Sequence, residues 1–451
     1  MFTEISMTNF KSWRETGPVR MAPLTAFFGA NSSGKSSLLQ MLLLLKQTAE
    51  SNDRGLVLKT GSMQPGYVNL GTPQEITFGD EKEMSLGVSW KLDPSSKMRV
   101  PIPGEERTLG ITNLAFATTI RAEQQRLYVK SLSYRQAEAF SVKLDRKDNN
   151  RYIIRARVVG KEARRPSHRP RVLMTAEKCY GFSDEALLYY QNTGYLRSLE
   201  HEFERQFRKL HYLGPLREYP QRTYVWGGER PSNLGLKGEQ AVHALLSGKS
   251  QSIYRGARGK YSKLDARVAK WLVDLDLSAS FETRPLFEGS NQYAVWLKRH
   301  EKSSETLLSD VGIGVSQVLP VLVLCYYVPV GSTIILEQPE LHLHPSVQAG
   351  LADVFIDVIQ KRDVQIIVES HSEHFLRRLQ RRIAEEKLNP CDTALYFCEM
   401  CVGESVLTPL EIDLFGDIRN WPEDFFGDMT GEILRIVKLG FERKVALADD
   451  S

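Results

Sequence analysis

The stretch Gly29-Ala30-Asn31-Ser32-Ser33-Gly34-Lys35-Ser36 decides the fold. It fits the phosphate-binding pattern G-x-x-x-x-G-K-[ST] without a mismatch. Residues 24–28 before it form an apolar run that predicts a strand, and residues 37–47 after it are rich in good helix formers. Strand, glycine-rich loop and helix are the context that this pattern requires, so the sequence predicts a nucleotide site here.

The residue types in this loop suit a polyphosphate. Glycines let backbone N–H groups close around phosphate oxygens, and the helix N-terminus adds partial positive charge. Lys35 is predicted to reach the terminal phosphates and the Ser36 hydroxyl to coordinate Mg²⁺, so the predicted cofactors are ATP and Mg²⁺. The predicted nucleotide contacts in the loop are Gly29, Asn31, Ser32, Ser33, Gly34, Lys35, Ser36 and Ser37.

A second group of polar residues follows two strands much later in the chain. Residues 333–336 form a short apolar run that ends at Glu337-Gln338-Pro339-Glu340. Residues 364–368 form another, which ends at Glu369-Ser370-His371-Ser372. Sheets of α/β proteins present their chemistry at the carboxyl ends of their strands. We therefore expect these segments to complete the nucleotide site.

With these motifs the chain resembles the ATP-binding-cassette (ABC) class of P-loop ATPases. More narrowly, it resembles prokaryotic AAA/ABC-type ATPases related to SMC proteins and to the overcoming-lysogenisation-defect (OLD) family. The resemblance covers about residues 1–74 and 212–444, and implies an α/β head built from N- and C-terminal segments around an inserted β-rich and helical lobe. It is carried by NFKSW with GANSSGKSS, LSDVGIGVSQVLP, IILEQPELHLHP and VESHSEHF, and by IDLFGDIRNWPEDFF, which resembles a C-terminal domain of uncharacterised function.

The resemblance implies a role for several residues of the head. Glu337 stands at the position of the metal-side acidic residue, and Gln74 is a candidate for the glutamine that senses metal and water. His371 matches the switch histidine that senses the γ-phosphate. Residues 9–13 lie where such proteins approach the adenine, and Trp13 is predicted to stack on it.

The resemblance also implies a signature motif at residues 309–317. In the family this motif closes over the ATP of a partner subunit, so that two heads enclose two nucleotides. The implied contacts are Ser309, Gly312 and Gly314. We therefore expect a homodimer or a higher homo-oligomer that forms through the ATPase heads.

One position departs from the family pattern. Many cassette ATPases carry a glutamate where this chain has Gln338. A glutamine amide can position water but cannot accept its proton, and general-base help is typically worth roughly 10²–10⁴-fold. Two hypotheses stay open: a slow ATPase in which Gln338 only orients water, or one in which the turn at Pro339 brings Glu340 into that role.

The middle of the chain lacks the repeated heptads that a coiled-coil arm requires. We predict strands at residues 84–92, 118–132 and 140–159, and helices at residues 187–210 and 261–277. The predicted domains are residues 1–75 and 301–400 for the two parts of the head, 76–210 for a β-rich and helical lobe, 211–300 for a helical connector and 401–451 for a tail domain.

Two basic segments are candidate partner surfaces. Residues 151–172 carry eight basic residues against one acidic residue. They form a solvated loop or bind nucleic acid or an acidic protein. The second cluster lies on the helix predicted after His371 and fits a dimer interface or a DNA-facing surface. The basic residues are Arg151, Arg155, Arg157, Lys161, Arg164, Arg165, Arg169 and Arg171 in the first segment, and Arg377, Arg378, Arg381 and Arg382 in the second.

The remaining histidines and cysteines give no metal site in the sequence, and two further arginines are candidate nucleotide contacts. His342 and His344 are expected to pack the turn after the metal-side strand, and His371-x-x-His374 is a poor metal motif without further ligands. Zinc at Cys391, Cys398 and Cys401 is not expected, since no nearby histidine supplies a fourth ligand. Arg217 and Arg222 are candidates for contacts near the nucleotide.

Composition sets the broad class. The chain has 451 residues, of which 42% are hydrophobic and 25% charged, with a net charge of +4. Such a chain buries a large core, and its five cysteines exclude a disulfide-stapled secreted scaffold. The longest apolar stretch, residues 318–330, is too short to span a membrane, and residues 1–13 have no signal-peptide core. We expect a cytoplasmic protein with no membrane partner.

The predicted function is an ATP-binding, slowly hydrolysing head that serves as sensor or scaffold for a separate effector, a nuclease or toxin, in anti-phage defence. No second catalytic constellation is visible, and the residues after Met400 are too few for the nuclease domain of the OLD family. The alternatives are a repair or maintenance ATPase that acts directly on DNA, and a non-hydrolysing module that nucleotide stabilises.

Overall fold

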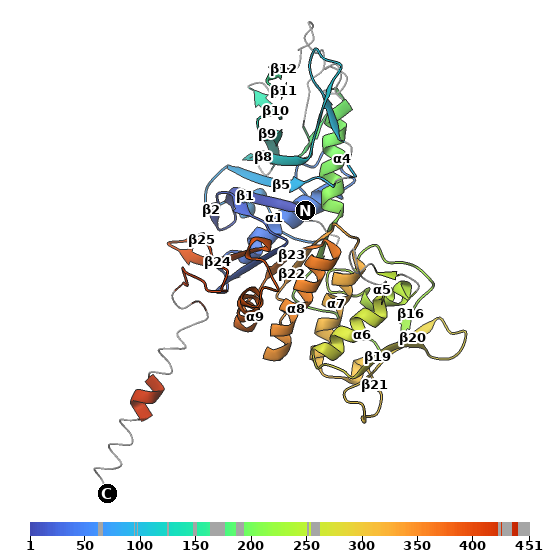
Figure 1. Ribbon diagram of the computed structural model, residues 1–451. Coiled ribbons are helices and arrows are strands. Elements are labelled where there is room, and N and C mark those ends of the chain that lie inside the picture. The colour runs from blue at the N-terminus through green and yellow to red at the C-terminus, as the bar shows by residue number, and fades with distance from the viewer. Residues whose placement is uncertain are drawn as a thin grey trace.

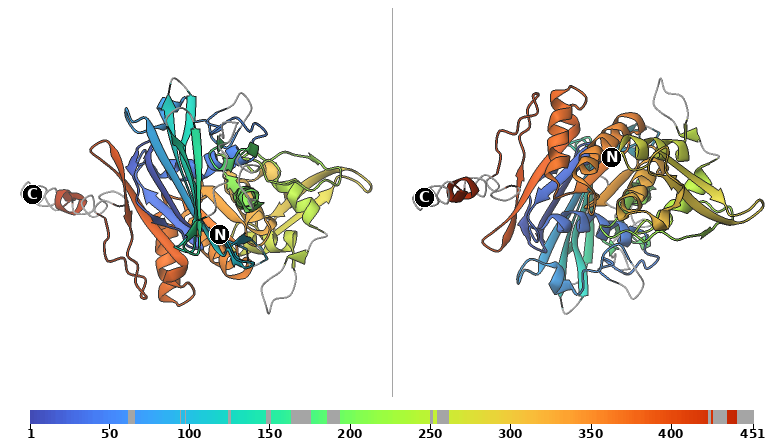
Figure 2. Two further views of the ribbon diagram at one scale, coloured as in Figure 1. Left: turned by 90° about the horizontal axis from the view of Figure 1, so that it is seen from above. Right: turned by 90° about the horizontal axis from the view of Figure 1, so that it is seen from below.

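The computed structural model describes residues 1–61, 66–93, 95–96, 98–123, 126–147, 151–162, 176–185, 194–249, 252–253, 262–422, 425 and 435–440. Figure 1 shows a central head, a β-rich lobe above it and a helical lobe beside it. Figure 2 shows that the helical lobe and residues 435–440 lie on opposite sides of the head. The α/β head with an inserted lobe that the sequence predicted is confirmed.

A six-stranded sheet forms the middle of the head within the described residues. Its order is β15-β22-β23-β4-β24-β25, and all neighbours are parallel except the last pair. The phosphate-loop strand β4 is therefore flanked by two strands from the last third of the chain. The bounds are β4 Leu24–Gly29, β15 Leu210–Leu213, β22 Thr333–Glu337, β23 Gln365–Glu369, β24 Thr393–Cys401 and β25 Glu404–Pro409.

Helices cover both faces of this sheet. All residues of β4 are buried, as expected for a central parallel strand. Alternate residues belong to different cores: Phe27 packs with the leucines of α1, and Phe28 packs with α7, α8 and α9. The helices of the head are α1 Lys35–Ala49, α7 Ile313–Tyr327, α8 Pro345–Arg362 and α9 Glu373–Ala384, with η2 Leu308–Asp310 and η3 Pro390–Asp392.

The β-rich lobe shares one antiparallel sheet with the first strand of the chain. Its order is β12-β11-β10-β9-β8-β5-β1-β2, with β3 paired to β1. The helix α4, Gly194–Arg208, packs Phe203 and Phe207 against this lobe. The strands are β1 Phe2–Phe10, β2 Trp13–Glu15, β3 Val19–Arg20, β5 Glu83–Lys91, β8 Asn113–Glu123, β9 Arg126–Gln136, β10 Phe140–Lys147, β11 Arg151–Val158 and β12 Lys161–Glu162.

Two sequence predictions need correction in this lobe. The single strand predicted at residues 118–132 is wrong, because two paired strands, β8 and β9, occupy this region. The strand predicted at residues 140–159 is likewise two strands, β10 and β11. Continuous alternation of apolar residues hid both turns. The short remaining elements are α2 Pro73–Ile76, β6 Arg99–Pro101, β7 Thr108–Gly110, β13 Ala176–Glu177 and β14 Gly181–Phe182.

The helical lobe packs α5 and α6 against α7. A small sheet of order β16-β20-β19, with β21 paired to β20, lies beside these helices. The apolar stretch at residues 318–330 is mostly the buried part of α7. Among the described residues, no helix is long and apolar enough to cross a membrane. The bounds are α5 Ala241–Gly248, α6 Leu264–Asp274, β16 Tyr224–Val225, β17 Ser252–Ile253, β18 Ser262–Lys263, β19 Ser280–Pro285, β20 Gln292–Lys298 and β21 Thr306–Leu307.

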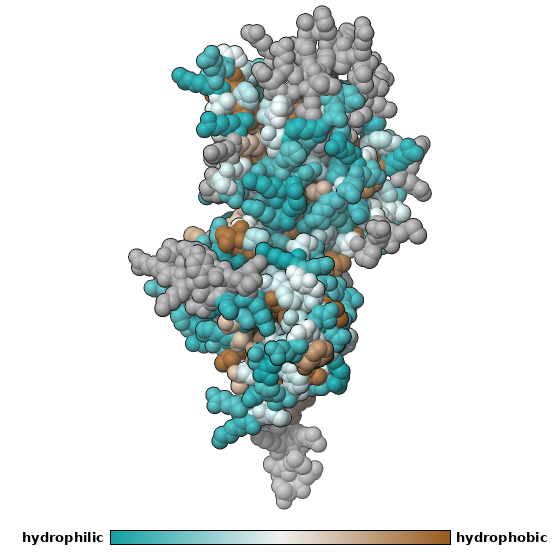
Figure 3. Space-filling model, turned by 90° about the vertical axis from the view of Figure 1, so that its right-hand side faces the viewer, coloured by the Kyte–Doolittle hydropathy of each residue, from teal (hydrophilic) through white to brown (hydrophobic). Residues whose placement is uncertain are grey.

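On the face shown in Figure 3, hydrophilic side chains predominate and hydrophobic ones lie in small separate patches. The exposed surface of this face therefore offers no broad apolar area that would identify a partner.

Candidate functional site

The phosphate loop connects the end of β4 to the start of α1, as the pattern predicted. Gly29 has φ 136°, and a Cβ there would lie 2.0 Å from the Cys398 carbonyl oxygen of β24. Gly34 has φ 92°, so both glycines hold backbone shapes that a side chain disfavours. The loop can therefore turn tightly between β4 and α1 and present its N–H groups.

Lys35 lies inside this loop. Its Nζ donates to the carbonyl oxygens of Ala30 at 2.6 Å and Gly29 at 3.1 Å. The side chain is only 3% exposed, and burial lowers its pKa, although the charge of Glu369 opposes this effect. The two carbonyl oxygens thus hold the Lys35 ammonium inside the loop. A phosphate bound in the loop would attract this positive charge.

Trp13 contacts the phosphate loop through its ring nitrogen. Its ring is fully buried, and Nε1 donates to the Gly34 carbonyl oxygen at 3.1 Å. The prediction that Trp13 stacks on an adenine is therefore wrong for this conformation, because no face of its ring is exposed. The residue positions the loop instead.

The loops after β15, β22, β23 and β4 form one edge of the head sheet, which we call the carboxyl edge. Glu337 at the end of β22 pairs in register with Glu369 at the end of β23. The Ser36 hydroxyl donates to Glu369 Oε1 at 3.1 Å. The edge thus brings together the phosphate loop, the predicted metal-side residue Glu337 and a second carboxylate.

The two carboxylates share a poorly solvated environment. Burial, and then the charge of Glu369, raises the pKa of Glu337 to about 7. Burial also raises the pKa of Glu369, while the Ser36 hydroxyl and the Lys35 ammonium oppose the rise. Neighbouring buried carboxylates raise each other's pKa because both cannot easily be charged.

Arg217 lies next to Glu337 on the far side of the edge. Its Nη2 donates to the Glu337 carbonyl oxygen at 3.5 Å, and burial lowers its pKa to about 10. Its Nε and Nη1 have no hydrogen-bond partner among the described residues. Arg222, the other arginine of this segment, instead pairs with Asp310 at 2.9 Å.

Glu340 points into the protein. Its Oε1 accepts the Ser370 hydroxyl at 2.9 Å and the His371 backbone N–H at 2.6 Å. The side chain is 8% exposed, and burial raises its pKa. Glu340 therefore links the turn after β22 to the loop that carries His371.

Gln338 occupies a strained turn. Its φ is 43°, and its backbone N–H donates to the Glu369 carbonyl oxygen at 2.9 Å. His371, across the edge, is half-buried, and burial followed by the charge of Lys35 lowers its pKa. A neutral imidazole there can donate to or accept from a phosphate environment.

The predicted structural role of one histidine in this region is supported. His344 Nδ1 accepts the Ser346 N–H at 3.3 Å and caps the N-terminus of α8. His342 has φ 63° within the same turn. Ser372 caps α9 by accepting the Phe375 N–H at 3.1 Å.

The predicted signature motif lies at the exposed beginning of α7. Gly312 is the N-cap of the helix, and Ile313 is 41% exposed, whereas the residues from Val315 onward are buried. Ser309 donates to Asp310 at 3.2 Å. Ser309, Gly312 and Gly314 therefore lie where a second molecule can reach them.

Gln74 lies on the short helix α2, with its side chain exposed. It lines a surface hollow together with Asp80, Lys82 and Arg121. The described contacts of this segment are with β1, through Lys11 and Thr77.

The residues at the carboxyl edge fit Mg²⁺. Mg²⁺ in nucleotide sites is held by one or two carboxylates together with phosphates and waters. Ser36, Glu337 and Glu369 offer a hydroxyl and two carboxylates, and Glu369 Oε2 is buried and accepts no hydrogen bond of normal geometry in the described part of the chain. No group of three or more His, Cys, Asp or Glu side chains suited to a metal occurs among those residues, so phosphates would have to complete the shell.

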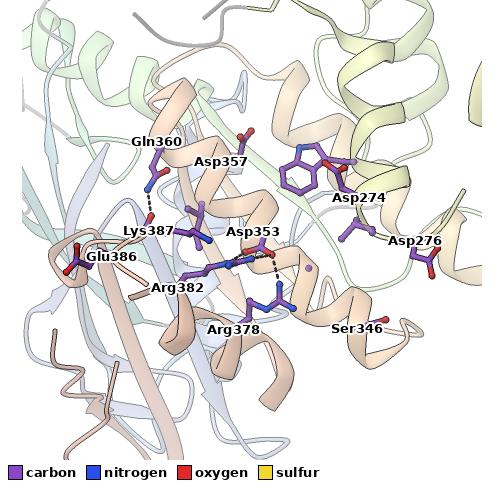
Figure 4. A pocket seen from close by; sticks show the side chains of 14 residues that line it. Asp274, Asp276, Ser346, Asp353, Asp357, Gln360, Arg378, Arg382, Glu386 and Lys387 are labelled. Carbon is purple, nitrogen blue, oxygen red and sulfur yellow. Dashed lines mark hydrogen bonds and ion pairs between the residues drawn. The ribbon is translucent and has the colours of Figure 1, made fainter. Parts of the chain in front are cut away.

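The second basic cluster is largely neutralised. Arg378 and Arg382 reach Asp353 of α8 at 2.6 Å and 2.8 Å. Figure 4 shows both side chains directed at Asp353 in a pocket of about 870 Å³ between α6, α8 and α9. Arg381 pairs with Glu385, and Arg377 pairs with Glu373. These pairs indicate that the arginines of α9 pack against acidic residues of the same chain, which argues against a DNA-facing surface here.

The first basic segment is only partly described. Arg155 and Arg157 are exposed on β11, and Lys161 pairs with Glu105 at 2.7 Å. Arg157 lies 3.5 Å from Glu162. The side chain of Arg151, and Arg164, Arg165, Arg169 and Arg171, lie outside the described residues.

The three cysteines in and before β24 differ in solvent exposure. Cys398 is buried, Cys401 is partly exposed and Cys391 is exposed before the strand. Burial raises the pKa of Cys398, which disfavours the thiolate that binds metals.

The sequence analysis named Glu369 only as the end of a strand, and it gave Tyr212 no role. Glu369 directly follows an apolar strand, as Glu337 does, and this matched position was the available signal. Tyr212 lies on β15, where its phenol forms a hydrogen bond with the Glu337 side chain that lowers the pKa of Glu337. No motif indicated Tyr212.

Comparison with known proteins identifies the family of this chain. A family model described as "AAA domain, putative AbiEii toxin, Type IV TA system" matches residues 24–377. A second, described as "Protein of unknown function (DUF3696)", matches residues 388–436. No curated protein matches the chain.

Solved structures with a similar fold include two SMC heads. An SMC head bound to the C-winged helix domain of ScpA has a TM-score of 0.46 and 10% identity, and the match covers 92% of this chain and 98% of that one. The SMC head domain from Thermotoga maritima has a TM-score of 0.37 and 12% identity, with coverage of 91% and 99%. Scores this low say nothing of what this chain binds.

The first family model spans well over half of the chain, and its limits enclose the phosphate loop, the predicted signature motif and the carboxyl edge. The chain is therefore a member of this AAA-domain family of P-loop ATPases, with the C-terminal region of unknown function attached.

Proposed function

We propose that this chain binds ATP with Mg²⁺, hydrolyses it slowly, and dimerises through its heads as a sensor or scaffold for a separate effector in anti-phage defence. The observation that carries the ATPase proposal is the carboxyl edge itself. There the loop residues Lys35 and Ser36 face two carboxylates, with an amide at position 338. The defence role draws on the family description, which names a toxin of a toxin–antitoxin system.

The residues divide the work as follows. Lys35 leaves its loop carbonyls to contact the terminal phosphates, and the loop N–H groups surround them. Ser36 and Glu337 would hold Mg²⁺, which would supply positive charge to the bound triphosphate. Gln338 orients the attacking water, and His371 donates a hydrogen bond to the γ-phosphate.

Slow turnover follows from the acid–base chemistry of this edge. The amide of Gln338 cannot accept a proton. Glu340, the other candidate base, already accepts two hydrogen bonds from the loop of His371. These features also favour the second candidate function, a module that binds nucleotide and dimerises without hydrolysis.

The proposed dimer uses the exposed beginning of α7. Gly312 and Gly314 leave the helix N-terminus open, so its N–H groups can meet a γ-phosphate held by a second head. Light scattering of the full chain with and without ATP and Mg²⁺ tests this step. We expect the mass to double with ATP, and an unchanged monomer mass with bound ATP would refute the dimer.

Phosphate release measured on the same sample separates the two candidate functions. Turnover at the low end of the ~1–10³ s⁻¹ typical of enzymes, or below it, supports the ATPase. Association without any phosphate release supports the non-hydrolysing module. A controlled comparison with Lys35→Ala shows whether the release comes from this site.

A further inference from the structure

The carboxylate of Glu369 is an unusual group to find beside a phosphate loop. It is 3% exposed and lies at the end of β23, the strand between the phosphate-loop strand and the strand of Glu337. One oxygen, Oε1, accepts the Ser36 hydroxyl at 3.1 Å. The carboxylate is thus in contact with the loop residue predicted to bind Mg²⁺.

The other oxygen of Glu369, Oε2, is buried and accepts no hydrogen bond of normal geometry among the described residues. Burial raises the pKa of Glu369, and the Gln338 side chain opposes this rise only weakly, through a hydrogen bond that is the smallest of the opposing effects. Glu337 and Glu369 are in register on adjacent strands. The charges of Lys35 and Arg217 compensate them only partly, because burial still raises the pKa of both carboxylates. Burying like charges together is costly unless a cation compensates them.

Glu340 differs from Glu369 in this respect. Its Oε1 already accepts two hydrogen bonds from Ser370 and His371, so its role in holding the neighbouring loop is visible in the structure. A purely structural role for Glu369 would require only its contacts with the Ser36 hydroxyl and the Gln338 side chain. That role leaves Oε2, and the closeness to Glu337, unexplained.

We propose that Glu369 is a second acidic residue on the metal side of the nucleotide site, acting with Ser36 and Glu337 to hold Mg²⁺. This inference rests on the proposed ATP binding and deepens it. Mg²⁺ prefers hard oxygen ligands and uses one or two carboxylates beside nucleotide phosphates. A cation there compensates both carboxylates and provides a partner for Oε2 of Glu369.

The proposal makes opposite predictions for the two states of the nucleotide. Without Mg²⁺, the Glu369 charge repels the triphosphate, so Glu369→Gln should leave ATP affinity unchanged or tighten it. With Mg²⁺, the same variant loses a metal-side carboxylate and should bind ATP more weakly. The stimulation of ATP affinity by Mg²⁺ should therefore fall at least ~10-fold, the lower end of the loss seen when groups supporting a metal site are removed.

Equilibrium binding of ATP to the full chain, in EDTA and in excess Mg²⁺, measures this stimulation without any turnover. Glu373→Gln is the matched control, since it removes the same charge four residues away from an exposed pair with Arg377. Glu369→Asp keeps the charge and should retain part of the stimulation. If Glu369→Gln does not fold, judged by its thermal unfolding, Glu369→Ala takes its place, and stimulation equal to wild type in that variant overturns the proposal.

For a folded Glu369→Gln, unchanged stimulation by Mg²⁺ overturns the proposal, and so does equal weakening with and without Mg²⁺, which a structural role predicts. Lys35→Ala in the same assay keeps the two proposals separate. If Lys35→Ala binds ATP like wild type, the ATP site itself is misplaced. If Lys35→Ala loses ATP and Glu369→Gln responds to Mg²⁺ normally, only the role of Glu369 fails.

Discussion

Replacing Gln338 by Glu should speed ATP hydrolysis. The two side chains have nearly the same shape, and the backbone N–H of residue 338 stays bonded to the Glu369 carbonyl oxygen, so the turn should be unchanged. A carboxylate at the water-orienting position can accept the proton that the amide cannot, and such help is typically worth roughly 10²–10⁴-fold.

The structure favours the lower end of that range. The new carboxylate would join Glu337 and Glu369, whose pKa values are both raised. Its own pKa should rise for the same reason, and a protonated acid cannot serve as a base. We therefore expect about 10²-fold near neutral pH, with a gain that grows as the pH rises and the new side chain loses its proton.

Glu340→Gln is the companion variant. The amide oxygen can still accept from the Ser370 hydroxyl and the His371 N–H, so the switch loop should keep its place. Losing the charge-assisted part of these bonds should lower the rate less than ~10-fold. The assay is phosphate release at saturating ATP and Mg²⁺, for both variants and the wild type, from pH 6.5 to pH 8.5.

One pattern would refute this reasoning. If Glu340→Gln silences the enzyme while Gln338→Glu leaves the rate unchanged, Glu340 is the base and must turn away from its present partners during the reaction. A fast wild type insensitive to both variants would place the catalytic edge on another strand.

Further predictions concern binding, assembly and stability. Lys35→Ala should weaken ATP binding roughly 10–100-fold, because a hydrogen bond to a charged group is worth about 1.5–3 kcal/mol. Titration calorimetry of ATP into the variant and the wild type measures this change. Equal affinity would contradict the loop assignment. Gly312→Asp should abolish ATP-dependent association in light scattering while leaving ATP affinity intact, because its carboxylate would repel the partner's γ-phosphate. His211 on β15 has its pKa lowered by burial to about 4 from 6.5, so it stays neutral in the fold. Its contribution to stability is therefore lost as the pH falls below about 6.5 toward 4, at most about 3 kcal/mol. His211→Gln should reduce this acid sensitivity in urea unfolding, whereas the exposed control His300→Gln should not.

The sequence alone predicted the parts of the site whose chemistry depends on local pattern. The phosphate loop between β4 and α1 follows from its glycines and its flanking apolar runs. The strands that end at Glu337 and Glu369 were visible because buried parallel strands are short apolar runs. Their neighbours in the sheet were implied by the family resemblance and not by the residues themselves.

Side-chain directions could not be predicted in the same way. Whether Glu340 faces the nucleotide or the loop of His371 depends on a turn with φ 43° at Gln338 and on partners 30 residues or more away. Trp13 was expected at an adenine because of its position, but the fold buries it under Gly34. The pairing of Arg378 and Arg382 with Asp353 likewise needs the packing of α9 on α8.

The strand β1 joins the inserted lobe to the sheet that contacts the phosphate loop. It is hydrogen-bonded to β5 of the inserted lobe. The next strand along the chain, β2, carries Trp13, whose Nε1 donates a hydrogen bond to the Gly34 carbonyl oxygen. Because these strands are hydrogen-bonded in sequence, one continuous sheet runs from β12 of the inserted lobe to the strand whose tryptophan bonds the phosphate loop. A molecule that binds the inserted lobe would therefore bind the same sheet that contacts the phosphate loop.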